Sequence, residues 1–229
     1  MIMTLSIETL RRIPALLLLG FTVGMAYAQS PAPDLATQQS IIHELEPRID
    51  ALKSDPKQLA QMIDEGRSRT ILCRTCHGKE GIAVKEMVPN LAGQNPVYIV
   101  DQFQRFGDGR RYDYLMSGLA KSFSDEDKIK IALFYSTLKP QASHDGDPAL
   151  IPEGEKLFTT ICSECHGKDG HGQKGYARLA GQRTDYVVKM LKEFRDRTGR
   201  RSNPWMTAVA FKLSEQQMQA VASYIANLE

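Results

Sequence analysis

The five-residue pattern Cys-x-x-Cys-His occurs twice in this chain, starting at Cys73 and at Cys162. It constrains the fold and the chemistry of the chain more than any other feature. Two cysteines three positions apart on a helical turn lie on neighbouring faces, so both thiols can reach the two vinyl groups on one edge of a porphyrin. The histidine that follows can then bind the iron as the proximal ligand. We therefore predict two covalently bound haem c groups, attached to Cys73, Cys76, Cys162 and Cys165, with His77 and His166 as proximal ligands.

Four cysteines could also form a zinc site, two disulfides or redox dithiols, but the spacing and the adjacent histidines make these alternatives less favourable. A four-cysteine zinc site usually has its two pairs about 15–20 residues apart, whereas Cys73 and Cys162 are 89 residues apart. Two disulfides in an exported protein would leave the histidine next to both pairs unexplained. A redox dithiol is a further use of Cys-x-x-Cys in a cytosolic chain. Haem attachment explains the cysteines and the histidines together.

Residues 1–28 have the form of a secretory signal peptide. Arg11 and Arg12 precede a short apolar run, 13–25, and a small-x-small cleavage site ends at Ala28. The run is too short to span a bilayer. We expect export to the periplasm, with an uncleaved anchor or a loose membrane association as alternatives. The formal net charge is only +2, and no concentrated basic face with interleaved aromatics argues for nucleic-acid binding.

The sequence after each pattern is repeated at an offset of 88 to 90 residues. Leu91-Ala92-Gly93-Gln94 recurs as Leu179-Ala180-Gly181-Gln182. The other paired positions are Tyr98 with Tyr186, Arg110-Arg111 with Arg200-Arg201, Met116 with Met206, Ser124 with Ser214, and Leu138 with Leu228. A near-constant offset over so many positions indicates duplication of a domain-sized unit.

Each unit is predicted to be all-α, so that the chain holds two tandem domains with one haem each. A helix carries each haem pattern, and a second helix follows at about 96–106 or 184–195. A capping box at Ser124 or Ser214 starts the last helix. We expect a signal peptide at 1–28, a leader at 29–54, a first domain at 55–140, a linker at 141–152 and a second domain at 153–229.

The leader contains an additional amphipathic helix over 38–52. Its apolar residues are Ile41, Ile42, Leu45, Ile49 and Leu52, and Pro47 must kink the helix or start it afresh. Asp55 followed by Pro56 predicts the start of the next helix. We favour packing of the leader helix on the first domain, with docking to a partner as the alternative.

The sixth iron ligand is predicted to be methionine. Met116 follows His77 by 39 residues, and Met206 follows His166 by 40. The methionines without a methionine partner in the other half are interpreted as core fillers: Met62, Met87, Met190 and Met218. The histidines at 43, 144 and 171 also lack partners. With both axial positions filled, neither iron has an open site for a substrate, which favours electron transfer over enzyme activity.

Together, the two haem patterns, the repeated Leu-Ala-Gly-Gln, the paired methionines and the capped last helix resemble dihaem cytochromes of the cytochrome c4 type. The resemblance covers 73–228. It implies two class I cytochrome c domains and a periplasmic carrier between a membrane quinol-oxidising complex and a terminal oxidase or reductase. The long leader departs from this family's pattern.

The resemblance also suggests partners for the haem groups. In mitochondrial-type cytochromes c, a Pro-x-Leu-x-Gly loop offers a backbone carbonyl to the proximal histidine. The first half has this loop from Pro89, and the second half has Ala177 instead of the proline. The paired arginines before each methionine are either surface charges or partners of haem propionates. Trp205 is expected to pack in a haem pocket.

Three functions remain open from the sequence. The first is a soluble electron carrier. The second is a cytochrome subunit of a periplasmic dehydrogenase, such as a flavocytochrome that oxidises sulfide. The third is an enzyme such as a dihaem peroxidase or a thiosulfate dehydrogenase, which needs an open or unusually ligated iron and is disfavoured by Met116 and Met206.

Overall fold

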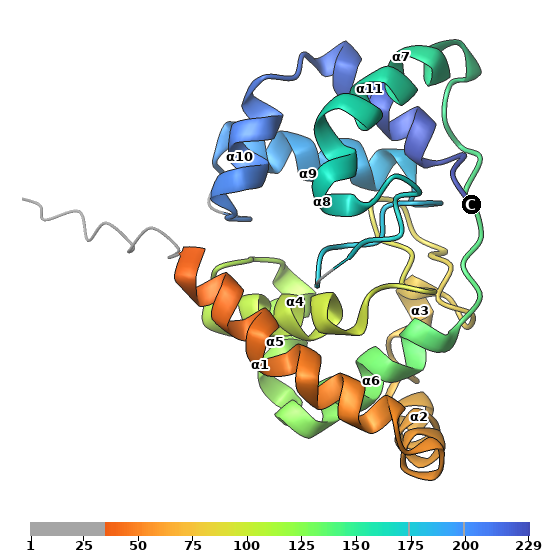
Figure 1. The fold of residues 1–229 in the computed structure, drawn as a ribbon, viewed down its shortest axis with the longest axis vertical. Helices are drawn as coiled ribbons and strands as arrows, with labels where there is room; N and C mark the ends of the chain where they lie inside the picture. The colour runs from red at the N-terminus through yellow and green to blue at the C-terminus, as the bar shows by residue number, and fades with distance from the viewer. Residues whose placement is uncertain (1–34, 174, 199) are drawn as a thin grey trace, which may run out of the picture. The chain divides into compact units, whose positions relative to one another are not determined.

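Helices and loops make up the described part of the chain, residues 35–173, 175–198 and 200–229, with side chains described from residue 43 onward (Figure 1). The structure is a computed structural model. Within these residues the only β-type pairing is an isolated bridge between Arg111 and Arg201. The all-α fold predicted from the sequence is confirmed, and the described residues belong to one compact unit. The predicted signal peptide, 1–28, lies outside the described residues.

The two halves repeat one order of helices. The first half contains α1 (Leu35–Lys53), α2 (Pro56–Arg69), α3 (Arg74–His77), α4 (Pro96–Asp108), α5 (Tyr114–Ser122) and α6 (Asp125–Thr137). The second half contains the 3₁₀ turn η1 (Pro148–Leu150), α7 (Ile151–Leu157), the π-helix η2 (Phe158–Cys162), α8 (Ser163–His166), α9 (Thr184–Asp196), α10 (Pro204–Phe211) and α11 (Glu215–Ile225). The segment predicted as a linker thus includes η1 and the first residues of α7.

The π-helix η2 corresponds to a one-residue insertion in the sequence of the second half. Gly66 and Gly154 are 88 residues apart, whereas Cys73 and Cys162 are 89 apart. The second half therefore has one additional residue between the glycine and the haem pattern. A wider π-turn takes up one residue without ending the helix. This turn lets α8 carry its cysteines as α3 does.

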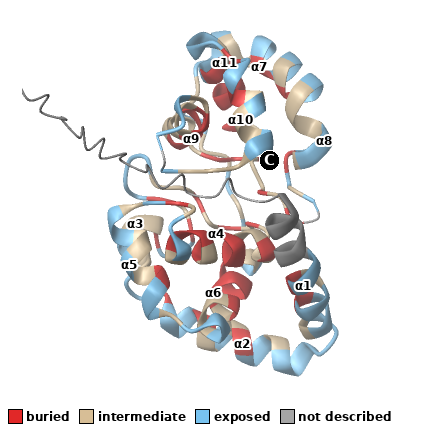
Figure 2. Cartoon of the chain, turned by 90° about the vertical axis from the view of Figure 1, so that its left-hand side faces the viewer, coloured by how far each residue is buried: buried red, intermediate tan, exposed pale blue. Residues whose placement is uncertain are grey.

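In each half, two helices pack together at a glycine. Gly66 on α2 lies directly against the backbone of Lys130 on α6, and Gly154 on α7 lies against that of Ala220 on α11. Buried residues of α4 and α6 form the first core, and those of α9 and α11 form the second (Figure 2). The last helix of each half contributes to its core, with Ile131, Phe134 and Tyr135 on α6 and Met218, Val221 and Ile225 on α11.

The leader helix α1 packs on the first half. Leu45 and Ile49 are buried in the first core, Ile49 with only 1% of its surface exposed. Arg48 forms an ion pair of 2.9 Å with Glu126 on α6. The interpretation of the leader as scaffold is therefore confirmed for its described part. The alternative in which Pro47 starts a new helix is wrong, because α1 continues through Pro47.

The helix starts agree with the sequence except in one detail. Asp55 accepts hydrogen bonds from the backbone of Lys57 and Gln58, as predicted. Ser214 and Gln217 form the complete reciprocal capping box. Ser124 accepts from the backbone of Asp127, but the Asp127 carboxylate instead pairs with Arg69 at 3.2 Å. Only half of the predicted first box is therefore formed.

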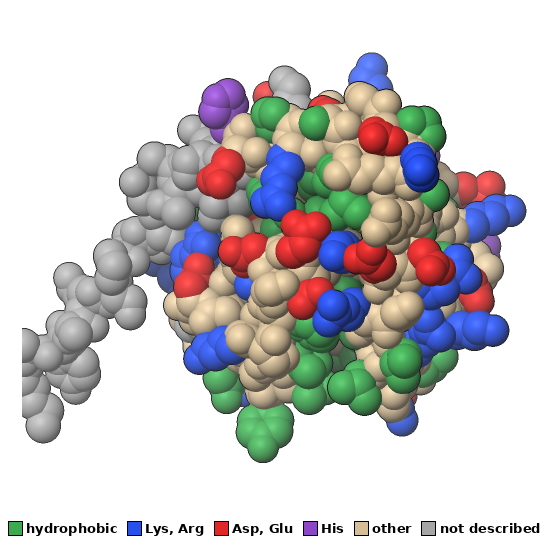
Figure 3. All heavy atoms as spheres, turned by 90° about the horizontal axis from the view of Figure 1, so that it is seen from below, with side chains coloured by type: hydrophobic (Ala, Val, Ile, Leu, Met, Phe, Trp, Pro, Cys, Tyr) green, Lys and Arg blue, Asp and Glu red, His purple; other side chains and the backbone are tan. Residues whose placement is uncertain are grey.

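The surface combines both signs of charge. On the face shown in Figure 3, acidic and basic side chains lie side by side. Lys130 lies between Glu65 at 2.6 Å and Glu126 at 3.8 Å. Such mixed surfaces produce local ion pairs rather than a strong field of one sign. No helix in the described ranges is long and apolar enough to cross a membrane.

Candidate functional site

The first haem pattern lies at the wall of an apolar cavity in the first half. The helix α3 contributes Cys76 and His77, Cys73 lies just before it, and α5 contributes Met116. The rest of the lining is apolar except for the Tyr135 hydroxyl: Leu72, Leu91, Ile99, Phe103, Leu115, Leu119, Phe123, Ile131 and Tyr135. Four side chains predicted from the sequence, Cys73, Cys76, His77 and Met116, are therefore brought to one cavity.

The proximal histidines are held by backbone carbonyls. His77 Nδ1 lies 2.9 Å from Pro89 O, and His166 Nδ1 lies 2.9 Å from Ala177 O. Because a carbonyl oxygen only accepts, Nδ1 carries the proton and the Nε2 lone pair is left for a metal. The second bond forms without the proline, as predicted. Burial lowers the pKa of both imidazoles, which favours the neutral, ligating form.

The thiols lie in apolar surroundings. Burial raises the pKa of the Cys73 thiol, and it raises the pKa of Cys162 to about 11. Both groups are therefore uncharged at neutral pH. The Tyr135 hydroxyl is buried in the same cavity wall and has no hydrogen-bond partner in the described part of the chain.

The second half has the same residue types around its own core. Cys162 and Met206 both pack on the cluster that contains Phe158. The His166 ring meets the Tyr176 ring edge to face, with centroids 6.2 Å apart. Cys162 and Met206 thus pack on one core of the second half, and His166 lies at the end of α8, four residues after Cys162.

The halves are joined by the glutamines that end the repeated Leu-Ala-Gly-Gln. Gln94 Nε2 donates to Arg178 O at 2.9 Å, and its Oε1 accepts from Arg178 N at 2.6 Å. Gln182 Nε2 donates to Asn90 O at 3.0 Å, and its Oε1 accepts from Asn90 N at 2.8 Å. No role was predicted for these glutamines from the sequence, although their repetition in Leu-Ala-Gly-Gln was visible there.

The paired arginines divide into two kinds. Arg110 bonds Asp108 at the surface, at 2.8 Å, and Arg200 is exposed. Arg111 is buried with its guanidinium carbon 4.3 Å from the centre of the Phe106 ring, and Arg201 lies 4.9 Å from that of Phe194.

Arg111 and Arg201 lack carboxylate partners among the described residues. Within the described ranges, the buried ion pair at this interface joins Arg105 to Asp101 at 2.7 Å, while Arg111 and Arg201 form no ion pair. Desolvated cations without a counter-ion are costly, so this interface suits a bound anionic group. The positive charge of Arg111 also lowers the pKa of His77, and the positive charge of Arg201 lowers the pKa of His166.

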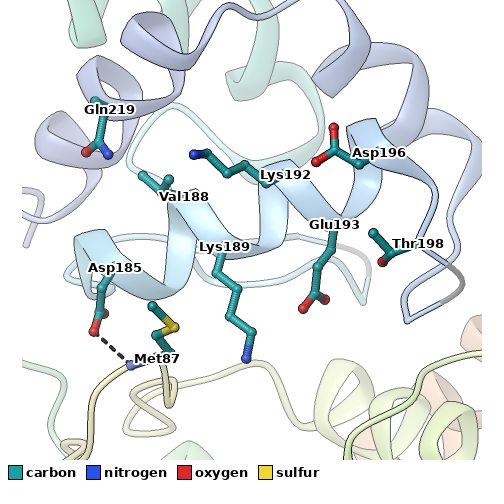
Figure 4. Close-up of a pocket in the computed structure, with 9 residues that line it drawn as sticks. All are labelled: Met87, Asp185, Val188, Lys189, Lys192, Glu193, Asp196, Thr198 and Gln219. Carbon is teal, nitrogen blue, oxygen red and sulfur yellow. Dashed lines mark hydrogen bonds between the residues drawn. The ribbon is translucent and has the colours of Figure 1, made fainter.

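A second hollow lies beside α9, and neither cysteine nor histidine lines it (Figure 4). The Met87 backbone N–H donates to Asp185 Oδ2 there, at 2.7 Å. Met87 is 52% exposed with φ of 56°, so its interpretation as a core filler is wrong. Trp205 is 63% exposed, contrary to the expected pocket packing. Met62, Met190 and Met218 are buried, as predicted.

Comparisons with known proteins agree with the geometry. A family model described as Cytochrome c matches residues 151–229. Cytochrome c4 of Pseudomonas aeruginosa is 34% identical over 175 residues, covering 71% of this chain and 87% of the relative. A thiosulfate dehydrogenase electron acceptor of Thiomonas intermedia is 34% identical over 173 residues, covering 67% and 77%. The solved structure of reduced recombinant cytochrome c4 from Pseudomonas stutzeri matches with a TM-score of 0.68 and 33% identity, covering 72% of this chain and 98% of that one.

Proposed function

Because the chain belongs to the cytochrome c4 family and is therefore a dihaem c-type cytochrome of electron transfer, we propose that it is a periplasmic electron carrier and not an enzyme. The observation that carries this proposal is the first cavity, whose wall includes Cys73, Cys76, His77 and Met116. An apolar cavity with these donors suits a redox group that is covalently held and shielded from water.

The residues of the cavity fit haem c. Two thiols lie one helical turn apart on one wall, next to an imidazole whose Nε2 is available. The thioether of Met116 belongs to the same cavity, and its other walls are apolar. Thioether and imidazole are the axial pair of electron-transfer cytochromes c. The sulfur and nitrogen donors, the absence of charge on them and the apolar lining all suit a porphyrin.

The proposed ligands follow from this fit. Cys73 and Cys76 hold the first haem, with His77 and Met116 as axial ligands. The corresponding ligands in the second half are Cys162 and Cys165 for attachment, with His166 and Met206 at the iron. A bound haem c supplies a one-electron ferric/ferrous couple.

The chain's own residues tune that couple. The carbonyls of Pro89 and Ala177 fix the orientation of the imidazoles and make them better donors. The soft methionine sulfur and the apolar lining favour the reduced form, which raises the potential. With two protein ligands per iron, no position is left for a substrate, and the geometry changes little on reduction.

The guanidiniums of Arg111 and Arg201 are proposed to face the haem propionates. They provide positive charge without a carboxylate partner in the described part of the chain, and this charge lowers the pKa of His77 and of His166. A guanidinium offsets the charge of a carboxylate through short, charge-assisted hydrogen bonds. Arg110 and Arg200 remain surface charges.

The domain plan is proposed as predicted, with cleavage of residues 1–28, a leader at 29–54, and haem domains at 55–140 and 153–229 joined by 141–152. The assay of haem content tests the whole assignment. The protein is first extracted with acid–acetone, which removes haem that is not covalently bound, and is then denatured. A pyridine haemochrome measurement is expected to give two haems per chain. One haem, or loss of haem on extraction, would contradict the proposal.

The proposed donor is a membrane quinol-oxidising complex, and the proposed acceptor is a terminal oxidase or reductase. A second candidate function is that of a cytochrome subunit of a periplasmic dehydrogenase. The thiosulfate dehydrogenase electron acceptor of Thiomonas intermedia favours thiosulfate oxidation over the sulfide-oxidising flavocytochrome as that candidate. Reduction of the pure protein by quinol-supplied membranes would support the first, and reduction by a thiosulfate-oxidising periplasmic fraction the second.

A further inference from the structure

At the interface, an arginine of each half donates a hydrogen bond to a tyrosine of the other half. Arg111 of the first half donates from Nη2 to the hydroxyl of Tyr186 in the second half, at 2.8 Å. Arg201 of the second half donates from Nη2 to the hydroxyl of Tyr98 in the first half, at 2.6 Å. The tyrosines occupy equivalent positions on α4 and α9, so each half holds the arginine of the other.

The remaining contacts of each guanidinium come mainly from its own half. Phe106 lies under Arg111, and Phe194 lies under Arg201. A ring under the flat face leaves the guanidinium free to rotate in its own plane. Hydrogen bonds at the edge are needed to fix that rotation. The tyrosine of the opposite half supplies such a bond in both cases.

The two arginines are not held equally well. Arg111 Nη1 donates to Gln102 Oε1 at 2.7 Å. The equivalent position on α9 is Met190, whose sulfur lies 2.8 Å from Arg201 Nη1. A thioether is a much weaker acceptor than an amide oxygen. Arg201 Nη1 also donates to the Tyr186 hydroxyl, but only at 3.4 Å. Neither acceptor matches the amide oxygen that Gln102 offers to Arg111, so Arg201 depends more on Tyr98 than Arg111 depends on Tyr186.

We propose that Tyr98 and Tyr186 are positioning residues that act across the interface, each setting the redox potential of the haem in the opposite half. This inference rests on the proposed ligands of the two haems. A fixed positive charge near an iron favours the reduced state, which carries one positive charge fewer. Loss of the tyrosine hydroxyl releases the guanidinium, so the potential of the opposite haem falls.

Tyr98→Phe and Tyr186→Phe, made in the full chain with both haems, separate this role from simple packing. Phenylalanine keeps the ring and removes only the hydroxyl. Tyr114→Phe is the matched control, because Tyr114 is 91% exposed. Redox titration gives the two midpoint potentials. Met116→His and Met206→His assign them, because imidazole in place of a thioether lowers the potential of the haem it ligates.

The expected result is a crossed response. Tyr98→Phe lowers the second-half potential more than the first, Tyr186→Phe lowers the first-half potential more than the second, and the Tyr98 effect is larger. Met190→Gln gives Arg201 an amide acceptor, so it is expected to reduce the effect of Tyr98→Phe. Tyr114→Phe leaves both potentials unchanged.

Equal shifts of both potentials, shifts only within the tyrosine's own half, or no shift would overturn the inference. An uncrossed shift with a lowered melting temperature would show that the tyrosines only pack the interface. Failure of Met116→His and Met206→His to move separate potentials would instead contradict the proposed ligands. The two failures are therefore distinguishable.

Discussion

Gly66→Ala is expected to destabilise the first half although alanine is the better helix former. A Cβ at Gly66 would meet the carbonyl oxygen and carbon of Lys130, both well inside the 3.0 Å below which real Cβ contacts essentially never occur. The contacted atoms are backbone, so no side chain can rotate away and α2 and α6 must separate. Overpacking of this kind costs about 1–3 kcal/mol, and occasionally more.

The higher helix propensity of alanine relative to glycine offsets about 1 kcal/mol of this cost. Because the obstacle is rigid, we expect the upper end of the overpacking range and a net loss of about 2 kcal/mol in the free energy of unfolding. Gly154→Ala is expected to behave alike in the second half, where the Cβ would meet the Ala220 carbonyl.

Gly118→Ala is the matched control. It lies inside α5, and no atom lies within 4 Å of the added Cβ. This variant is expected to gain about 0.5–1 kcal/mol from helix propensity alone. Urea unfolding of the ferric protein, followed by far-ultraviolet circular dichroism, gives all three values. A Gly66→Ala variant as stable as Gly118→Ala would refute the close packing of α2 on α6.

Two further predictions concern the leader and the interface. Ile49→Ala is expected to lower the free energy of urea unfolding by about 2–4 kcal/mol, and a loss below about 0.5 kcal/mol would argue against α1 as scaffold. Gln94→Ala and Gln182→Ala each leave a backbone N–H and C=O unpaired at the interface, which is expected to cost about 1–3 kcal/mol in the same assay; no loss in either would argue against these bonds.

The sequence predicted the features that repeat. The haem patterns, the helix order and the carbonyl bond to His166 followed from the duplication and from local chemistry. Hydrophobic periodicity and helix capping depend on residues only a few positions apart, so both can be recognised in a single sequence. The one-residue difference in offset was also visible in the sequence, although its form as a π-helix was not.

The misjudged residues depend on contacts across the interface or on the surface. Met87 is exposed because its loop is drawn to Asp185 in the other half. Asp127 leaves the capping box because Arg69 lies close to it in space. The difference between Arg110 and Arg111 also depends on how the halves meet, since Tyr186 lies beside only one of them. Sequence periodicity contains no information on such partners.

The central claim is that each iron is held by His77 and Met116 or by His166 and Met206, and its most direct test is spectroscopic. The ferric protein is expected to show the weak near-infrared sulfur-to-iron band of methionine-ligated haem. Met116→Ala and Met206→Ala should each remove half of that band and open one of the two irons to carbon monoxide, while Met87→Ala and Met190→Ala should do neither. If Met87→Ala or Met190→Ala removed the band instead, the paired methionines would not be the ligands and the account of both sites would be wrong.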